Sequence, residues 1–439
     1  MSAELKKTLS PIMLWGLGVG YVISGMYFGW NLGLKEGGTF GMGLATMAVI
    51  IMYVCFSFSY SELACAIPKA GGAFDYATRA LGKDIGFIAG IVQAVEFIFA
   101  PPAIAFGIGA YFHLLFPYIP VIAFATAAYI LFTALNIYGV KAAASFEFFV
   151  TIIAMSGLFL FCFVTAPHFS MNNFTQDVFP KGLKGAFAAL PFAIWFFLGI
   201  EGVANVAEES INPQKDIIKG FGSAILTLVA LCVLTFIFSV GVGGWQLIVF
   251  DQSGALSDSP LPLAAKSVTG ENSLVYKLVI AVGTFGLIAS FHGLLLAAGR
   301  ATFELGRVGY APGFLGAIHP RFQTPYAALI SNMVIGILAL LTGKTGEIII
   351  ISVFGALVMY IISMFALIVF RIKEPQAIRP FKVPLYPLTP ILALITAFVF
   401  LAAMIVFYWE TALVFFLLLL FSFVAFKYLV KLPLQKITE

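Results

Sequence analysis

The sequence predicts an all-α membrane protein with twelve transmembrane helices. Three observations carry this prediction. Of the 439 residues, 61% are hydrophobic and only 10% are charged, and the mean hydropathy is +1.04, so the bilayer is the natural solvent. Twelve apolar stretches are long enough to cross it at about 20 residues each. Two of these stretches, five spans apart, are interrupted at matching positions, which is typical of inverted-repeat secondary transporters.

The expected spans follow one another along the chain with short connections. In the first half they cover 11–34, 41–67, 85–116, 119–138, 142–166 and 186–207. In the second half they cover 218–243, 274–299, 326–342, 346–370, 388–408 and 411–430. Long polar loops are expected outside the cell at 167–185 and 244–272, and a Pro-rich loop is expected inside at 371–387. The short ends 1–10 and 431–439 are expected to be the cytoplasmic termini.

The basic residues indicate which loops face the cytoplasm. The net charge is only +4, but all the arginines and most lysines fall in alternate inter-span segments. By the positive-inside rule both termini are cytoplasmic and the number of spans is even. We therefore expect a multi-pass protein of the cell (inner) membrane, in contact with lipid. Nucleic-acid binding is not implied, because the charge follows membrane sides.

A chain with so little soluble mass is a transporter, a channel or an intramembrane enzyme. An enzyme would need a nucleophile with its base, or metal ligands, and the sequence has no HExxH, GxSxG or clustered His/Asp pattern. A channel would show a repeated filter or rings of charge, and neither occurs. We predict a transporter with no enzymatic activity, no cofactor and no metal site.

The first interrupted span reads "YVISGMYFGWNLGL" (21–34), in which glycines alternate with large aromatic residues. The second reads "GAFAALPFAIWFFLGIEGVANVAEES" (185–210), with Pro191, Gly199 and Gly202 around Glu201. In membrane proteins, unwound backbone is tolerated where it lines a cavity, and the helix ends there offer partial charges to a substrate. The alternative is that these glycines only permit close helix packing.

Several segments resemble a known family. "SYSELACAIPKAGGAFDYATRALG" (59–82) resembles the link between helices 2 and 3 of the amino acid–polyamine–organocation (APC) family, and "VAEESINPQKDI" and "RPFKVPLYPLTP" match it too. The resemblance covers nearly the whole chain. It implies a five-plus-five inverted-repeat (LeuT-like) core, with repeats 11–166 and 186–370 and an added helix pair at 388–430. "GWNLGLKEGGTFG" and "FIFAPPAIAFGIGAYF" are similar to the bacterial ethanolamine permease branch.

The first interruption also bears on the substrate. In amino-acid carriers of this family, helix 1 unwinds at a Gly-Ser-Gly-like element whose amides hold the substrate carboxylate. Aligning "SGMYFGWN" on that element places Gly29, Trp30 and Asn31 there, and only Gly29 fits. A carboxylate needs unobstructed amides, whereas an indole attracts an alkylammonium by roughly 0.5–2 kcal/mol. The departure favours a small amine such as ethanolamine, with an amino acid transporter or exchanger of the same family as the alternative.

Glu96 is the most informative single residue. It lies in mid-span, where an ionised acid costs on the order of 2.5–3.5 kcal/mol. Pro101 and Pro102 follow it and cannot donate to the carbonyls of Phe97 and Ile98. The resemblance implies that this position lines the pocket, so Glu96 is a candidate counter-ion for the substrate ammonium. Alternatively, it is paired with a hydroxyl or amide for packing.

The resemblance implies a cavity between helices 1, 3, 6 and 8. The expected substrate-binding residues besides Glu96 are Tyr27, Gly29, Trp30, Trp195, Phe197, Leu198, Glu201 and His292. Trp195 is implied to pack over the substrate, with Phe197 and Leu198 unwound beside it. Glu201 either responds to protonation or gating, or caps amides freed at the break. His292 is a pocket or proton-titrating residue, or a hydrogen-bonded core residue.

The remaining acids bear on gating and coupling. Glu62 and Glu208, with neighbouring Glu209, lie at cytoplasmic helix ends near Lys69, Lys215 and Lys219, and we expect gate or loop ion pairs. Glu147 receives no assignment. Some proton-coupled relatives carry a Lys in helix 5 where this chain has Ala154. A sodium site involving Ser290, protons carried by Glu201, and uncoupled entry of a cation all stay open, and no oligomeric state is predicted.

Overall fold

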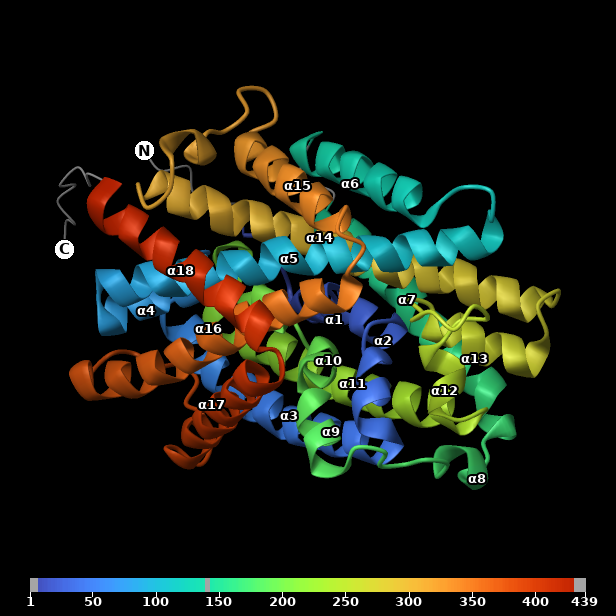
Figure 1. Cartoon of the computed structure of the whole chain (residues 1–439). Coiled ribbons are helices and arrows are strands. Elements are labelled where there is room, and N and C mark those ends of the chain that lie inside the picture. Colours follow the sequence, from blue (N-terminus) through green and yellow to red (C-terminus); the bar gives the residue numbers. More distant parts are fainter. Residues whose placement is uncertain (1–6, 139–142, 430–439) are drawn as a thin grey trace.

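The protein is helical throughout the part of the chain that its computed structural model describes, residues 7–138 and 143–429 (Figure 1). Within these residues, ten helices are long and apolar enough to cross a membrane, and two shorter apolar helices accompany them. A multi-pass membrane protein is therefore confirmed, while the exact number of twelve spans stays a prediction. Residues 431–439 and most of the N-terminal segment 1–10 lie outside the described residues, as does the start of the span expected at 142–166.

The first expected span is broken near its middle. Helix α1 (Pro11–Val22) is followed by the single turn α2 (Ser24–Tyr27). Phe28 is then fully extended, Gly29 has φ +88°, and helix α3 (Leu32–Ala66) begins at Leu32. A positive φ is the conformation that glycine adopts at little cost, so Gly29 permits the chain to turn here.

Helix α3 joins the end of the first expected span to the second. The two are separated by a kink at Gly38, where φ is +62°. A side chain at Gly38 would meet Pro180 and the Val178 carbonyl, and the Phe40 amide donates to that carbonyl at 2.7 Å. The outer segment before the sixth span therefore fills the bend, which the hydropathy pattern alone does not indicate.

The next spans lie close to their expected bounds, and the connections hold extra helices. The segment from 73 to 188 forms α4 (Ala73–Leu81), α5 (Lys83–Leu115), α6 (Val121–Tyr138), α7 (Ala143–Thr165), the 3-10 turn η2 (Ala166–His168), α8 (Met171–Phe174) and α9 (Gly182–Ala188). Helix α4 was not expected. It is amphipathic and buries Phe74, Tyr76 and Ala77 against the spans.

The second interrupted span breaks in the same manner as the first. Helix α10 (Leu190–Trp195) ends at Trp195, and residues 196–199 form turns. Gly199 has φ +94°, and the chain continues as the 3-10 helix η3 (Ile200–Glu209). Every residue from Leu190 to Ala207 is buried, so this irregular backbone lies inside protein and away from lipid, as the bilayer requires.

The second half is built from long helices and a folded outer loop. Its elements are α11 (Pro213–Gly241), α12 (Trp245–Val249), α13 (Pro260–Thr269), α14 (Leu274–Arg307), η4 (Gly313–Gly316), α15 (Tyr326–Leu340), α16 (Thr345–Lys373), α17 (Leu388–Phe407) and α18 (Trp409–Leu429). The loop expected to be simply polar at 244–272 contains α12 and α13. Trp245, Ile248 and Leu261 are buried there, which holds both helices against the spans.

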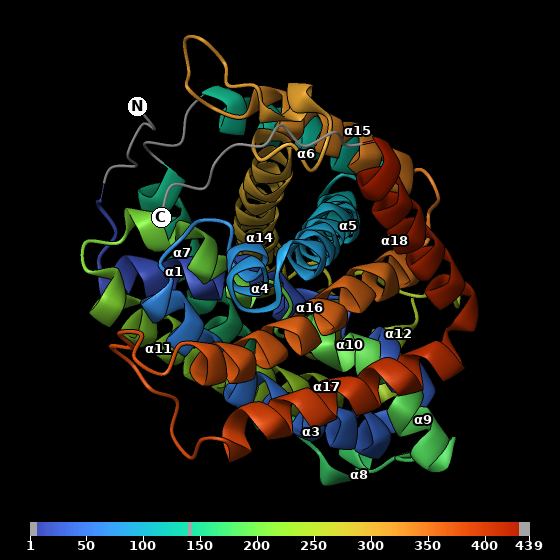
Figure 2. The same ribbon diagram turned by 90° about the vertical axis from the view of Figure 1, so that its left-hand side faces the viewer.

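The helices form a bundle with a central pair and an outer layer. In both views α5 and α14 run side by side through the middle, and α16 packs on α5 (Figures 1 and 2). Helices α17 and α18 lie on the outside (Figure 2), where they expose Phe398, Val406 and Phe421. Helix α4 lies at one end of the bundle and α8 and α13 at the other (Figure 1), consistent with loops on opposite sides of a membrane.

Candidate functional site

The two interrupted segments face each other inside the bundle. The indole Nε1 of Trp195 donates to the Phe28 carbonyl at 3.0 Å, and the two rings meet edge-to-face at 5.7 Å. Gly25 lies so close to the Trp195 carbonyl that a Cβ on it would be only 2.5 Å from that oxygen. Both breaks therefore depend on the same few contacts, and a shift of one requires a shift of the other.

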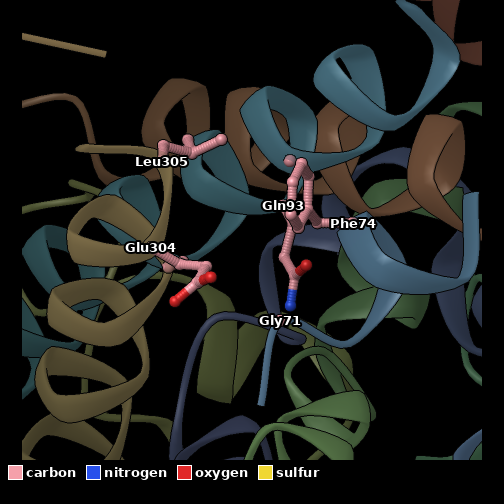
Figure 3. A pocket seen from close by; sticks show the side chains of 7 residues that line it. Gly71, Phe74, Gln93, Glu304 and Leu305 are labelled. Atoms are coloured by element: carbon pink, nitrogen blue, oxygen red, sulfur yellow. The ribbon is translucent and has the colours of Figure 1, made fainter. Parts of the chain in front are cut away.

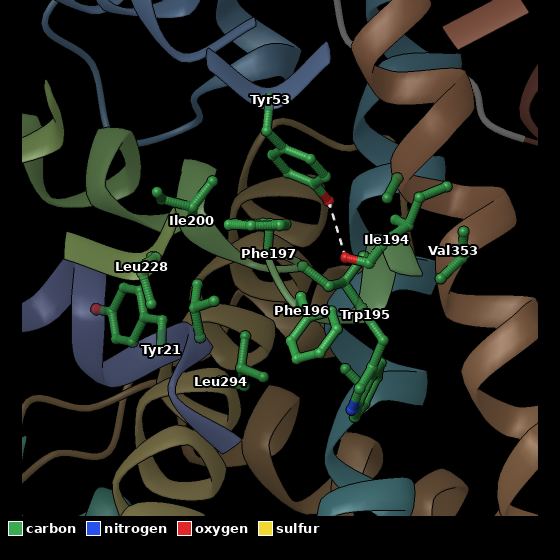
Figure 4. Close-up of a cluster of buried hydrophobic side chains, with 14 of the residues drawn as sticks. Tyr21, Tyr53, Ile194, Trp195, Phe196, Phe197, Ile200, Leu228, Leu294 and Val353 are labelled. Carbon is green, nitrogen blue, oxygen red and sulfur yellow. Dashed lines mark hydrogen bonds between the residues drawn. The ribbon is translucent and has the colours of Figure 1, made fainter. Parts of the chain in front are cut away.

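A small apolar cavity lies beside these breaks. It is a narrow, partly open space of about 160 Å³, too tight in this conformation to admit a water molecule, and is lined by Ser24, Ala100, Ile104, Trp195, Leu198 and Leu294. These residues come from α2, α5, the second interrupted segment and α14. Of the expected substrate-binding residues, Trp195 and Leu198 line this cavity. Figure 4 shows Trp195, Phe196 and Phe197 spreading from the interrupted segment, with Leu294 nearby.

Two carboxyl groups lie next to each other at the level of the second break. Glu96 on α5 and Glu201 on η3 are both fully buried, and their carboxyls are neighbours. Glu96 contacts the Glu201 carboxyl and the Gly199 backbone amide, but neither of its oxygens forms a well-aligned hydrogen bond with another described residue. In one apolar site, two carboxyl groups can both be charged only when a cation accompanies them. Otherwise they share a proton, and the pair carries a single negative charge at most. The arrangement can therefore bind a positive charge.

Two tyrosines connect this carboxyl pair to the other spans. The Tyr360 hydroxyl on α16 donates to Glu201 Oε2 at 3.1 Å, and the Tyr53 hydroxyl on α3 lies 2.9 Å from that of Tyr360. The Tyr53 ring also packs against Phe197 at 5.2 Å (Figure 4). Sequence reasoning missed both tyrosines. The only signal in the sequence was a tyrosine, whose hydroxyl is polar, within an otherwise apolar run, as in "VIIMYVCF" and "GALVMYIISM".

Backbone amides of the first break already have partners. The Gly29 amide donates to Asn31 Oδ1 at 3.1 Å, and the Ser24 amide donates to the Ser290 hydroxyl at 2.9 Å. The Asn31 side-chain amide in turn donates to the carbonyls of Ile248 and Ser257 in the outer loop. Asn31 therefore ties the break to the outer loop while it occupies an amide that a substrate carboxylate would need.

Tyr27 and Trp30 are not among the residues that line the cavity. The Tyr27 hydroxyl donates to the Ala154 carbonyl at 2.6 Å, and its ring lies against Gly283 and Gly286 of α14. The Trp30 ring stacks on Phe196 at 5.2 Å, and its Nε1 donates to the Met26 carbonyl. Both side chains are fully buried and support the wall behind the cavity.

His292 lies in a different place from the carboxyl pair. Its Nδ1 is 3.3 Å from Glu147 Oε2, and the rings of Phe132 and Phe146 flank it. The structure thus pairs His292 with Glu147, the acid that the sequence left without a role, and not with Glu96 or Glu201. Ser290, named for a sodium site, instead donates to the Gly20 carbonyl at 2.7 Å.

The acids expected at cytoplasmic helix ends take part in contacts between distant parts of the chain. Arg371 binds both oxygens of buried Glu62, and the Val383 amide donates to the same carboxyl at 2.7 Å. The Glu208 carboxyl accepts the Ala70 amide at 3.0 Å. Glu209 pairs with Arg300 at 2.6 Å. The ionic partners that the structure shows are arginines from α14 and α16, where the sequence suggested nearby lysines.

A second hollow lies between α4, α5 and α14. It holds about 210 Å³ of space, open in part to solvent, and Gly71, Gln93 and Glu304 are among its lining residues. Figure 3 shows Glu304 and Gln93 entering it from α14 and α5. The Gln93 amide donates to Asn205 Oδ1 at 3.1 Å. This contact joins α5, at the hollow, to the middle of η3.

The end of the bundle away from α4 is formed in part by the folded loop that contains α12 and α13 (Figure 1). The Thr345 hydroxyl at the start of α16 donates to Asp258 of this loop at 3.1 Å. Burial of this carboxyl raises the pKa of Asp258 to about 6. Among the described residues no group of three or more His, Cys, Asp or Glu side chains could hold a metal ion.

Comparison with known proteins identifies the family. The model of the amino acid permease family matches residues 13–436. An uncharacterized transporter of Rhizobium meliloti is 30% identical over 409 residues, covering 89% of this chain and 85% of its own length. A branched-chain amino acid permease of Bacillus subtilis is 28% identical, with 89% and 87% covered. A low-affinity putrescine importer of Escherichia coli is 26% identical, with 77% and 75% covered.

Proposed function

This chain belongs to the amino acid permease family, and from that premise we propose that it imports a small amine, best represented by ethanolamine, by alternating access across the cell (inner) membrane. Members of the family are transporters and not enzymes. Relatives carry branched-chain amino acids in one case and putrescine in another. Both a zwitterion and a cation are therefore substrates within the family, and the choice between them depends on this chain's own residues.

The observation that carries the proposal is the buried pair Glu96 and Glu201. Their two carboxyls are in contact in one apolar environment, and neither Glu96 oxygen has a well-aligned hydrogen-bond donor within the described structure. An ammonium group offers three donors and one positive charge, which compensates such a pair. A charge-assisted hydrogen bond contributes about 1.5–3 kcal/mol, so Glu96 is proposed as the counter-ion of the substrate.

The neighbouring cavity supports a short substrate. Its lining is apolar apart from Ser24 and the indole Nε1 of Trp195, and that Nε1 is already bonded to Phe28. A chain of two carbons with a hydroxyl at its end matches the chemistry of this lining, with the Ser24 hydroxyl placed to bond it, once the narrow space widens to admit the substrate. Ala100 lies one helical turn beyond Glu96, so ammonium and hydroxyl could be held a few ångströms apart.

The first interruption provides little for a carboxylate. Its Gly29 and Ser24 amides are bonded to Asn31 and Ser290. A carboxylate placed there would have to displace both partners. This favours a substrate without an acid group. The alternative is an amino acid transporter or exchanger of the same family, in which Asn31 and Ser290 release these amides on binding.

The arrangement of the two breaks supports a repeated architecture. We propose that 11–166 and 186–370 are inverted repeats in a LeuT-like core and that 388–430 is an addition. Each break contains a glycine with positive φ, Gly29 or Gly199, followed by a new helical segment. A bundle of helices 1, 2, 6 and 7 would then rock against helices 3, 4, 8 and 9, with both chain termini in the cytoplasm.

The substrate is tested by uptake of labelled ethanolamine into proteoliposomes that contain the full chain. Unlabelled ethanolamine should compete fully, whereas alanine, arginine and choline should compete at least tenfold less well. If alanine displaces ethanolamine at a comparable concentration, the substrate class is that of an amino acid carrier and the amine proposal is wrong.

The role of Glu96 is tested with Glu96→Gln, which keeps the shape and removes the charge. We expect a roughly 10- to 100-fold loss of apparent affinity, the equivalent of one charge-assisted hydrogen bond. Glu347→Gln is the matched control, because that carboxyl is exposed and pairs with Lys344 on the surface. Near-normal transport by Glu96→Gln would contradict the proposed role.

A further inference from the structure

A second buried ionisable pair lies apart from the carboxyls of the substrate site. Glu147 on α7 and His292 on α14 are 1% and 6% exposed, and Glu147 Oε2 lies 3.3 Å from His292 Nδ1. The other carboxylate oxygen, Oε1, is buried and has no hydrogen-bond partner in the described part of the chain. A buried acid with a free oxygen beside a histidine needs an explanation, and the substrate site does not provide one.

The free oxygen points at the helix that carries the first break. A Cβ on Gly20 of α1 would lie 2.6 Å from Glu147 Oε1, and one on Gly293 of α14 would lie 3.2 Å from it. Only glycine leaves room for the carboxyl at these two positions. Gly20 is four residues before Ser24, which lines the cavity. Any movement of α1 therefore changes the packing and hydration of Glu147.

The groups around the pair allow it to hold one proton. From α1 it faces Tyr21, whose ring lies against Gly293, and from α7 and α6 it faces Thr151, Phe146 and Phe132. Tyr21 is also near Arg300 and Glu209, which pair with each other at 2.6 Å. With one proton the pair has no net charge, whether the proton is on the carboxylate or on the imidazole. Without that proton it carries one negative charge, which is costly in a membrane interior.

We propose that the Glu147–His292 pair is the proton-binding site that couples transport to a proton gradient. The proposal rests on the transport function proposed above. With its proton, the neutral pair allows α1 to stay packed with Gly20 against the carboxyl. When the proton leaves to water, the remaining charge favours separation of α1 from α7 and α14, where water can solvate it. Movement of α1 in turn alters the cavity through Ser24.

The same region is poorly suited to a sodium ion. Hard cations require several oxygen ligands, and apart from Glu147 Oε1 the oxygens named below are engaged. The Ser290 hydroxyl donates to the Gly20 carbonyl while it accepts the Ser24 amide. The Thr151 hydroxyl donates to the Gly16 carbonyl at 3.3 Å. A sodium ion would have to replace these hydrogen bonds, whereas a proton leaves all of them in place.

The experiment separates coupling from substrate transport in proteoliposomes. Counterflow of labelled ethanolamine without any gradient measures transport alone, and accumulation driven by an inward proton gradient measures coupling. We expect Glu147→Gln and His292→Gln to keep counterflow within about twofold and to lose at least tenfold in gradient-driven accumulation. Proton entry that accompanies the substrate, recorded with a trapped pH-sensitive dye, should be lost in both variants.

Two further variants distinguish titration from structure. Glu147→Asp keeps an acid and should retain proton-driven accumulation. His113→Gln, at a half-buried histidine near the end of α5 whose ring makes a hydrogen bond with the Ile119 carbonyl, should behave as wild type. Proton entry that persists in Glu147→Gln, or accumulation in the wild type that needs sodium instead of protons, overturns the proposal. If the wild type exchanges labelled alanine but not ethanolamine, the amine proposal fails, and the same variants are then scored with alanine.

Discussion

Replacement of Gly29 by alanine tests whether the two breaks act as one unit. Gly29 has φ +88°, where an L-residue costs about 1–2 kcal/mol more than glycine. A Cβ there would also lie 2.5 Å from Nε1 and 2.7 Å from Cδ1 of Trp195. The indole must then move away from the Phe28 carbonyl, which loses a hydrogen bond worth about 1 kcal/mol.

The backbone strain and the lost hydrogen bond together destabilise the arrangement that forms the cavity by about 2–3 kcal/mol. If the penalty falls on the transport-competent state, uptake should decrease by roughly 30- to 150-fold. The assay is counterflow of labelled substrate, normalised to reconstituted protein, with thermal unfolding in detergent measured alongside.

Gly254→Ala is the matched control for this substitution. Gly254 has φ +82°, and nothing lies within 4 Å of a Cβ built on it. It therefore carries the same backbone strain without the displaced indole, and we expect its transport to stay within about twofold of wild type. If Gly29→Ala transports as well as Gly254→Ala, the inferred dependence of the cavity on the Trp195–Phe28 contact is wrong.

Two more predictions concern the ends of the bundle. Arg371→Ala leaves the buried Glu62 carboxylate without its main counter-ion and should lower the free energy of unfolding by about 3 kcal/mol. Arg79→Ala removes an exposed pair and should cost under about 1 kcal/mol; equal thermal shifts for the two variants would refute the distinction. At the outer end, burial raises the pKa of Asp258 to about 6. The folded protein therefore binds this proton more tightly than the unfolded chain does, and stability should fall as pH rises from about 4 to 6. Asp258→Asn should flatten that slope in thermal unfolding, and an unchanged slope would contradict the assignment.

The helices and their interruptions were largely predictable from sequence. A long apolar run forms a helix when it crosses a membrane, because every backbone polar group must then be hydrogen-bonded within the segment. Gly29 and Gly199 lie where the chain turns with positive φ, since the local need for glycine is a property of the backbone itself. Trp195 ends the helix before the second break and Leu198 lies within the break. Both side chains line the cavity beside it.

Side-chain partners were much harder to predict. His292 was grouped with the substrate site, but it pairs with Glu147, which had no assigned role. Trp30 was expected to face the substrate, yet it stacks on Phe196 behind the cavity. Periodicity says which residues share a helix face, but it does not say which other helix lies against that face.

The sequence by itself therefore determined the membrane class, the helical architecture, the family and the location of both breaks. These follow from hydropathy, glycine placement and motifs that are local in the chain. Only the tertiary structure decided that Glu96 lies beside Glu201, that Asn31 occupies the Gly29 amide, and that Glu147 meets both His292 and Gly20. Apart from the local bond of Asn31, these contacts join residues separated by about 100 positions or more. Such contacts depend on the packing of whole helices, which no local pattern records.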